Sequence, residues 1–217
     1  MEAIKGITSD ARFLLKIVIL FSTGGTLASK FLNVFLIRAT GSITLIVGQS
    51  ILFATATLLA FLLGTKLLAK INVTTVLRVG IFLILLYYLM ILIFQNWISF
   101  FLIPLGIVNG LGNGFYWCAV NILLGRLVSD ENRGKFFGLQ KVFGNLFGIF
   151  IPTISGFVII SFANFTGYYM LFSAAVLLLL CTVFLSFKMT GFTSENQLDA
   201  LPILKVKGNK YWDANKW

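Results

Sequence analysis

The sequence predicts an all-α protein, a polytopic membrane bundle of six transmembrane helices. Hydrophobic residues make up 59% of the 217 residues and charged residues only 11%, and the mean hydropathy is +0.97. A soluble domain of this size could not bury so much apolar surface, so a large part of it must face lipid. The apolar segments are runs of Leu, Ile and Phe without the period-2 alternation of a transmembrane β-barrel. Composition and periodicity therefore predict membrane-spanning helices.

The spacing of the charged residues gives the number of spans. The first span runs through Lys30 to Arg38, and the second fills the uncharged stretch before Lys66. The stretches 79–125 and 142–187 also carry no charge. As a single helix, each would be roughly 70 Å long, against about 30 Å of hydrocarbon, so each must form two spans. With polar turns at 95–97 and 163–167, the expected helices are 13–38, 42–63, 74–95, 97–125, 138–162 and 167–187.

The distribution of Lys and Arg predicts the orientation of the bundle. Basic residues concentrate before the first span, after the second, after the fourth and after the sixth, whereas Arg38 belongs to the opposite side. The positive-inside rule then places both termini in the cytoplasm of a multi-pass cell-membrane protein. The same rule explains the net charge of +10, so no nucleic-acid partner is expected. The first apolar run lacks a small-residue cleavage site and is expected to be retained.

Acidic residues and histidines are missing from the predicted spans. All seven Asp and Glu residues fall in predicted loops or tails, and the chain has no histidine. General acid–base or metal-assisted chemistry inside the membrane therefore has few candidate residues, which argues against an enzyme and predicts no catalytic residue, metal or cofactor. Cys118 and Cys181 fall inside predicted helices, where we expect them to pack as small apolar residues.

Two inner loops and one helix carry recognisable motifs. The loop at 64–72 begins with Gly64 and is basic up to Arg78, and the loop at 129–139 has an acidic run before Arg133, followed by a Phe-Gly pair. In the helix that follows, four residues repeat at intervals of four: Gly144, Gly148, Pro152 and Gly156. Together these motifs resemble the N-terminal six-helix half of a major facilitator superfamily (MFS) transporter. Leu68 stands where the first loop of the family has an aspartate.

The resemblance implies an architecture and a set of moving parts. Residues 1–12 would form a cytoplasmic N-terminus, 13–188 a bundle of two inverted three-helix repeats, and 189–217 a cytoplasmic tail or a linker to a second half. The residues expected to act in gating are Gly64, Lys70, Arg78, Asp130, Arg133, Gly148 and Pro152. The glycine–proline stripe resembles one found in antiporter branches of the family, and close helix packing is the alternative explanation.

In such a fold the first and fourth helices are counterparts that line the cavity. Both carry a polar stripe at helical spacing, and such stripes turn inward because lipid offers them no hydrogen bonds. Either the stripes line a solute pocket or they hydrogen-bond helices together. The candidate substrate-binding residues on the two stripes are Thr26, Lys30, Asn33, Asn109, Asn113 and Trp117.

Lys30 is the most informative of these residues. It lies 14 residues after Lys16, or about 21 Å further along a helix in a hydrocarbon core of about 30 Å. A buried ammonium is costly unless it reaches water, an anion or a partner, and the predicted spans supply no carboxylate. A role in the cavity, with a polar or anionic solute, is one explanation. Snorkelling toward the outer interface is the other.

The sequence therefore predicts an MFS-like permease that moves a small solute by alternating access. Its partners would be the lipid bilayer, a small and possibly anionic or polar solute, and a second six-helix half from the same gene or another copy. The alternative is a six-helix membrane protein that acts as an assembly or regulatory subunit without transporting.

Overall fold

The computed structural model describes residues 8–68 and 70–189, and these residues confirm the predicted all-α membrane bundle. They form six long helices: α1 (Ser9–Thr40), α2 (Ile43–Leu67), α3 (Val73–Ile93), α4 (Ile98–Leu127), α5 (Asp130–Ser161) and α6 (Thr166–Phe187). All six are long and apolar enough to cross a membrane. One turn of 3-10 helix, η2 (Gln95–Trp97), joins α3 to α4 at the predicted polar turn. Of the predicted tail at 189–217, all but Met189 lies outside the described residues.

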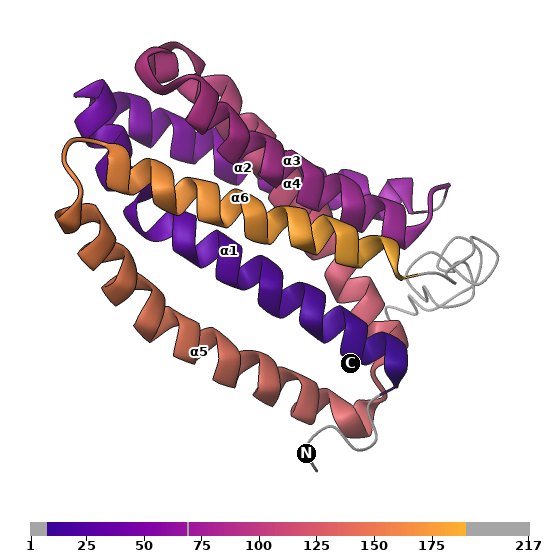
Figure 1. The fold of residues 1–217 in the computed structure, drawn as a ribbon. Coiled ribbons are helices and arrows are strands. Elements are labelled where there is room, and N and C mark those ends of the chain that lie inside the picture. The colour runs from indigo at the N-terminus through magenta and orange to yellow at the C-terminus, as the bar shows by residue number, and fades with distance from the viewer. Residues whose placement is uncertain (1–7, 69, 190–217) are drawn as a thin grey trace, which may run out of the picture.

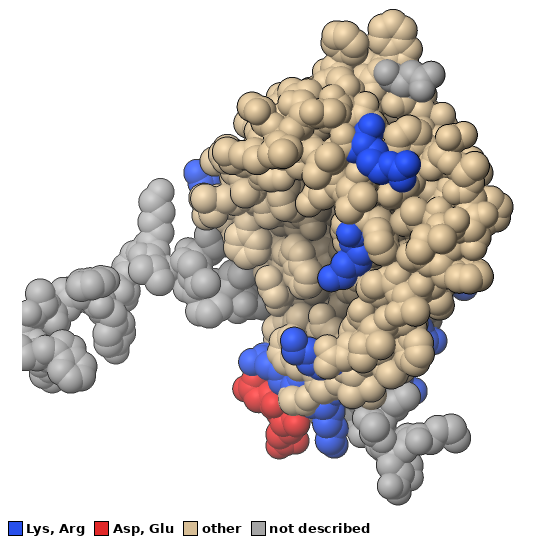
Figure 2. Space-filling view, turned by 90° about the vertical axis from the view of Figure 1, so that its left-hand side faces the viewer, with Lys and Arg blue, Asp and Glu red and all other residues tan. Residues whose placement is uncertain are grey.

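The helices run alternately up and down, so α1 begins and α6 ends at the same end of the bundle (Figure 1). Most of the described Lys and Arg residues, and all the described acidic ones, lie at or near this end, which we call the basic end. Figure 2 shows the acidic side chains and several basic ones gathered at one end, with separate basic side chains further along the visible face. At the opposite end the described helices carry Arg38.

Two helices begin earlier than the sequence predicted. α1 starts at Ser9, because the Thr8 hydroxyl accepts a hydrogen bond from the Ala11 N–H and so caps the helix. α5 starts at Asp130 instead of residue 138, so most of the predicted loop at 129–139 is helical. Asp130 and Glu131 lie in its first turn, where negative side chains stabilise the helix dipole. The acidic run is therefore a helix start as well as a loop motif.

The turns at the opposite end depend on left-handed backbone conformations. Gly41 ends α1 with φ of 64°, and its N–H donates to the Ile37 carbonyl. The α5–α6 turn places Asn164 at φ of 57°. Glycine and asparagine are the residues that adopt this region most readily. These two turns fix how α1 passes into α2 and how α5 passes into α6.

The packing of the six helices follows a two-fold internal pattern. α4 packs against α2 and α3, and α1 packs in the corresponding way against α5 and α6. α1 also contacts α4, and α3 contacts α6. If α1 is exchanged with α4, α2 with α5 and α3 with α6, these pairs of neighbouring helices stay the same, as two inverted three-helix repeats require. α1 and α4 occupy the centre, and α5 lies at an edge of the bundle beside α1 (Figure 1).

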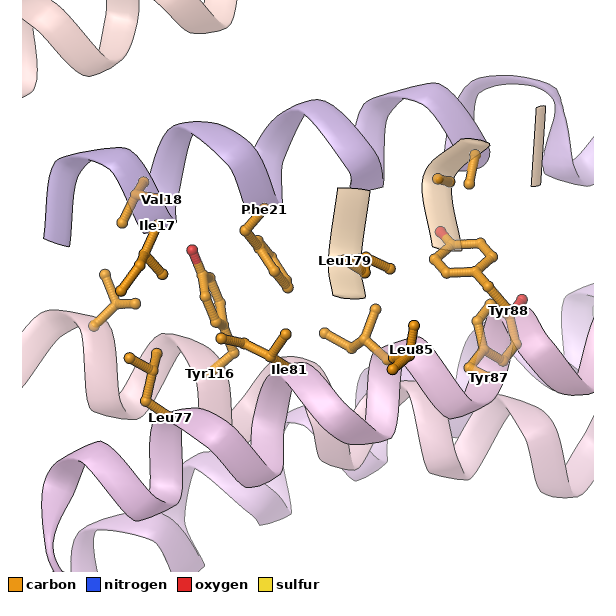
Figure 3. Close-up of a cluster of buried hydrophobic side chains, with 14 of the residues drawn as sticks. Ile17, Val18, Phe21, Leu77, Ile81, Leu85, Tyr87, Tyr88, Tyr116 and Leu179 are labelled. Atoms are coloured by element: carbon orange, nitrogen blue, oxygen red, sulfur yellow. The ribbon is translucent and has the colours of Figure 1, made fainter. Parts of the chain in front are cut away.

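A single apolar core ties the two repeats together. Phe21 of α1 stacks on Tyr116 of α4, with ring centroids 3.6 Å apart. Residues of α3 such as Ile81 and Leu85, and Leu179 of α6, surround this pair (Figure 3). Stacked aromatic rings add to the stabilisation that burial of their area already provides. The core thus holds α1 and α4 together at the centre of the molecule.

Glycine allows α4 to approach its neighbours closely. A methyl group on Gly106 would lie 2.8 Å from the Gln49 carbonyl oxygen of α2, and one on Gly112 would lie 3.0 Å from the Gly80 carbonyl oxygen of α3. Gly110 and Gly114 face α2 in the same way. By contrast, a methyl group on Gly144 or Gly148 of α5 would meet no heavy atom within 4 Å. These glycines of α4 therefore allow close helix packing, and Gly144 and Gly148 of α5 do not take part in it.

Candidate functional site

A polar hollow lies between α1 and the first half of α5. Its volume is about 400 Å³, and six residues line it: Ser22, Phe137, Gln140, Lys141, Gly144 and Asn145. A second hollow of only about 20 Å³ adjoins it, shares three of these residues and extends along α1 to Thr26. Because Gly144 lacks a side chain, α5 leaves room there. We call the two hollows together the α1–α5 hollow.

Two hydroxyl groups of α1 are available to a ligand in this hollow. Hydroxyls in these spans commonly donate to a carbonyl one turn earlier, as Thr23 does to Ile19 over 2.7 Å. Ser22 and Thr26 make no such hydrogen bond within the described chain. In a membrane a hydroxyl without a local acceptor is stabilised by water or a polar ligand. These two groups therefore mark the α1 wall of the hollow as a polar surface.

The predicted residues of α1 continue along the same stripe. Thr26 lines the hollow, and Lys30 and Asn33 follow at intervals of four and three residues as exposed side chains. Lys30 forms no ion pair with any described residue. The stripe thus presents a hydroxyl, an ammonium and an amide in succession along α1.

The predicted residues of α4 are arranged differently. The Asn113 side-chain amide donates to the backbone oxygen of Asn109 at 3.1 Å and to its side-chain oxygen at 3.0 Å. These bonds run along α4 and do not join two helices. Trp117 is 39% exposed, and its ring meets Tyr116 edge to face. The α1–α5 hollow is lined by residues of α1 and α5, and none of its described lining residues belongs to α4.

The residues predicted to act in gating occupy several places near the basic end. Gly64 packs α2 on α4, since a methyl group there would lie 2.9 Å from the Cys118 sulfur. Lys70 is exposed just beyond α2. Arg78 of α3 donates to the Ser186 and Met189 carbonyls, both at 3.2 Å, and its guanidinium lies 4.7 Å from the Phe187 ring centre. It therefore fastens the end of α6 to α3.

The remaining gating candidates lie on α5. Arg133 pairs with Asp130 at 2.9 Å within the first turn, so the ion pair is local to this helix. Both residues line a hollow of about 420 Å³ between the start of α1 and the α4–α5 connection. Gly148 faces open space, and Pro152 lies inside α5, half-buried.

Sequence reasoning missed two members of the α1–α5 hollow, Ser22 and Gln140. Ser22 lies four residues before Thr26 and so extends the predicted stripe of α1 by one turn. Gln140 carries an amide inside a predicted span, and a polar side chain at that place could have identified it as a candidate. From the sequence, Lys141 and Asn145 at the inner end of the fifth predicted span could line the cytoplasmic mouth, although the positive-inside rule explains Lys141 better. The structure places both residues in the hollow.

Comparison with known proteins identifies the family. Residues 13–209, which contain nearly all of the six-helix bundle, match the model of the Major Facilitator Superfamily. The chain belongs to the major facilitator superfamily. The MFS is a superfamily of transporters, so this multi-pass membrane protein has the fold of a transporter half. The resemblance of the inner loops is thereby confirmed at the level of the family.

Two relatives show the range of lengths among similar proteins. A Bacillus subtilis (strain 168) protein, described as "Uncharacterized protein YqgE", is 30% identical over 203 residues, which are 94% of this MFS chain and 46% of that protein. The chain thus spans about half the length of this relative. A Geobacillus stearothermophilus protein, "Uncharacterized protein in sodM 3'region", is 28% identical over 175 residues, 81% of this chain and 82% of that protein.

Proposed function

We propose that this MFS chain moves a small polar or anionic solute across the cell membrane by alternating access. It would act as one six-helix half, the N-terminal one, with both termini in the cytoplasm. The observation that carries this proposal is the family match across the bundle. In alternating access, two such halves rock about a solute site between them, and no covalent chemistry is required.

The polar stripe of α1 supports the need for a second half. Ser29, Lys30 and Asn33 are exposed, as are Lys141 and Asn145 of α5. In contact with lipid these groups would lose their hydrogen bonds with water, which is unfavourable by several kcal/mol for a charged group. A second half that covers this side would instead enclose a hydrated cavity. The second half would come from a longer chain, as the length of the Bacillus relative suggests, or from another copy.

Uptake into proteoliposomes tests the transport function. The purified chain is reconstituted and offered a mixed panel of small carboxylates, phosphate esters, sugars and amphiphiles, whose entry is followed by mass spectrometry. We expect at least one polar or anionic solute to enter faster than into empty liposomes. If none enters although the chain is inserted and paired, the non-transporting assembly or regulatory subunit becomes the better explanation.

Disulfide crosslinking tests the pairing of two copies when the chain is expressed alone. With Cys118 and Cys181 replaced by serine, Ser29→Cys should crosslink to a second copy across the polar side. Ser173→Cys is the matched control, because Ser173 is also an exposed serine but lies on α6. Crosslinking at 173 and not at 29 would contradict pairing through the polar side.

A further inference from the structure

Lys141 is a charged residue within a span that the polar stripes of α1 and α4 do not include. Lys141 lies in α5, 11 residues after the helix starts at Asp130, or about 16 Å along its axis. It lines the 400 Å³ hollow together with Ser22 and Asn145, and it forms no ion pair with a described residue. The nearest described acidic residues on its own helix, Asp130 and Glu131, lie in the first turn. The ammonium thus faces a hollow that holds no carboxylate.

We propose that Lys141, Ser22, Gln140 and Asn145 form a binding site for the anionic group of the solute, in the α1–α5 hollow. This site rests on the proposed transport function and is separate from Lys30. The ammonium would supply the charge, and the Ser22 hydroxyl and the Asn145 amide would donate hydrogen bonds to anionic oxygens. A carboxylate and a phosphate group present the same chemistry to these donors.

The Gln140 amide gives independent support for a ligand in the hollow. Its side-chain oxygen is buried and accepts no hydrogen bond within the described chain. A buried polar atom without a partner is costly and is usually satisfied by water or a ligand. Gln140 lines both parts of the hollow. A hydrated anion, or a solute that also carries a hydroxyl group, would supply the missing donor.

The spacing to Lys30 indicates how this site relates to the predicted one. Ser22, which shares the hollow with Lys141, lies eight residues before Lys30 on α1, or about 12 Å along the helix axis. Along α1, the level of Ser22 and Lys141 therefore lies nearer the basic end, and Lys30 lies nearer the opposite end.

Lysine reactivity tests the site without requiring transport. The chain in lipid nanodiscs is treated with an acetylating reagent, and modification of each lysine is measured by mass spectrometry. Inorganic phosphate and succinate are the two probes, and chloride holds the ionic strength constant. We expect saturable protection of Lys141, while Lys66, an exposed lysine at the end of α2, stays equally reactive throughout. Protection by one probe only would assign the site to phosphate or to carboxylate groups.

Matched variants show whether the hollow itself is responsible. Asn145→Ala and Ser22→Ala should each weaken protection roughly tenfold, because each removes one hydrogen bond to a charged group. Gly144→Leu should abolish protection by filling the hollow. Gly148→Leu should keep it, since Gly148 faces open space one turn further along and does not line the hollow.

Any of three results would overturn the proposed site. Neither probe protects Lys141, protection is equal at Lys66, or protection of Lys141 is unchanged in Gly144→Leu. Intact protection in a chain that transports nothing would instead contradict the proposed function and leave the site standing. The two proposals can therefore fail separately.

Discussion

At the scale of single residues, Lys30 remains the strongest test of a polar pathway along α1. It is exposed, lies four residues after Thr26 on the polar stripe, and has no carboxylate partner among the described residues. The structure is compatible with a hydrated cavity and with snorkelling, because both leave the ammonium exposed. Measuring solute uptake by variants of Lys30 separates the two explanations.

We predict that Lys30→Met folds as well as the parent but loses at least tenfold in solute uptake. Methionine keeps a long apolar side chain and removes only the charge, so the bilayer should accept it more readily. Lys30→Arg should retain part of the uptake. The measurement is initial uptake rate into proteoliposomes at equal amounts of inserted protein. Undiminished uptake by Lys30→Met would assign Lys30 to snorkelling.

Arg78 shows how one side chain fixes the end of a helix. Its guanidinium donates to two carbonyls at the end of α6 and lies over the Phe187 ring. A positive charge at a helix C-terminus also interacts favourably with the helix dipole. The sequence predicted Arg78 as a gating residue of the family loop, and the structure shows it in a clamp between α3 and α6.

Arg78→Gln should therefore lower the free energy of unfolding by roughly 2 kcal/mol, since charged hydrogen bonds and a cation–π contact are lost. For a chain of this size we expect the melting temperature to fall by roughly 4–8 °C. Thermal denaturation in detergent measures this change. Arg12→Gln is the control, because Arg12 is exposed on the first turn of α1. Equal melting temperatures for the two variants would show that the clamp contributes nothing.

At the scale of helices, α4 and α5 show that similar glycine patterns lead to different packing. Both helices carry glycines at intervals of four residues and one internal proline. Those of α4 bring it against α2 and α3, whereas Gly144 and Gly148 of α5 face open space.

The start of α6 is held by Arg38 of α1, which donates to the Tyr168 hydroxyl and lies 5.4 Å from the Phe165 ring centre.

Gly110→Ala and Gly148→Ala form a matched pair for this difference. A methyl group on Gly110 would lie 2.7 Å from the Ala56 methyl and against the Phe53 carbonyl, so α2 and α4 would have to separate. We expect this variant to lose several kcal/mol of stability or to fail to accumulate. Gly148→Ala should be neutral or stabilising by up to about 1 kcal/mol, because alanine favours the helix. Unfolding in detergent measures both, and similar losses would contradict the packing.

At the scale of the whole molecule, six spans place the start of α1 and the end of α6 at one end of the bundle. The described Lys and Arg residues concentrate at that end, which the positive-inside rule assigns to the cytoplasm. The orientation itself is a prediction from this asymmetry.

Reporter fusions test the orientation and the span number together. A reporter fused after Lys66, Lys135 or Lys188 should be active in the cytoplasm, and one fused after Asn96 or Asn164 outside it. Asn96 and Asn164 lie in the described turns and Lys188 directly follows α6, whereas Lys66 lies in the last turn of α2 and Lys135 within the first turns of α5. A cytoplasmic reporter at Asn164 would contradict the pairing of α5 with α6 as a hairpin.

The sequence by itself determined the number of spans, their approximate ends and the family. The number and approximate ends of the spans are local properties, because helix rise, bilayer thickness and the positions of charges fix them without knowledge of neighbours. The family came from the resemblance of the loop motifs. The predicted helix ends agree with the structure within two residues, apart from the end of α2 and the starts of α1 and α5. Both starts precede the apolar stretch, so hydropathy gave no signal there.

Only the tertiary structure decided which faces of the helices meet. The glycines of α4 and α5 share one spacing. No feature of the neighbouring sequence indicates that Gly110 packs on α2 while Gly148 does not. Likewise, Ser22, Gln140 and Lys141 line one hollow because α5 lies beside α1 at their level. The rotation and neighbours of a helix depend on the fit of all six helices. The periodicity of a sequence predicts which residues share one face of a helix, and the packing of the bundle determines which neighbour covers that face.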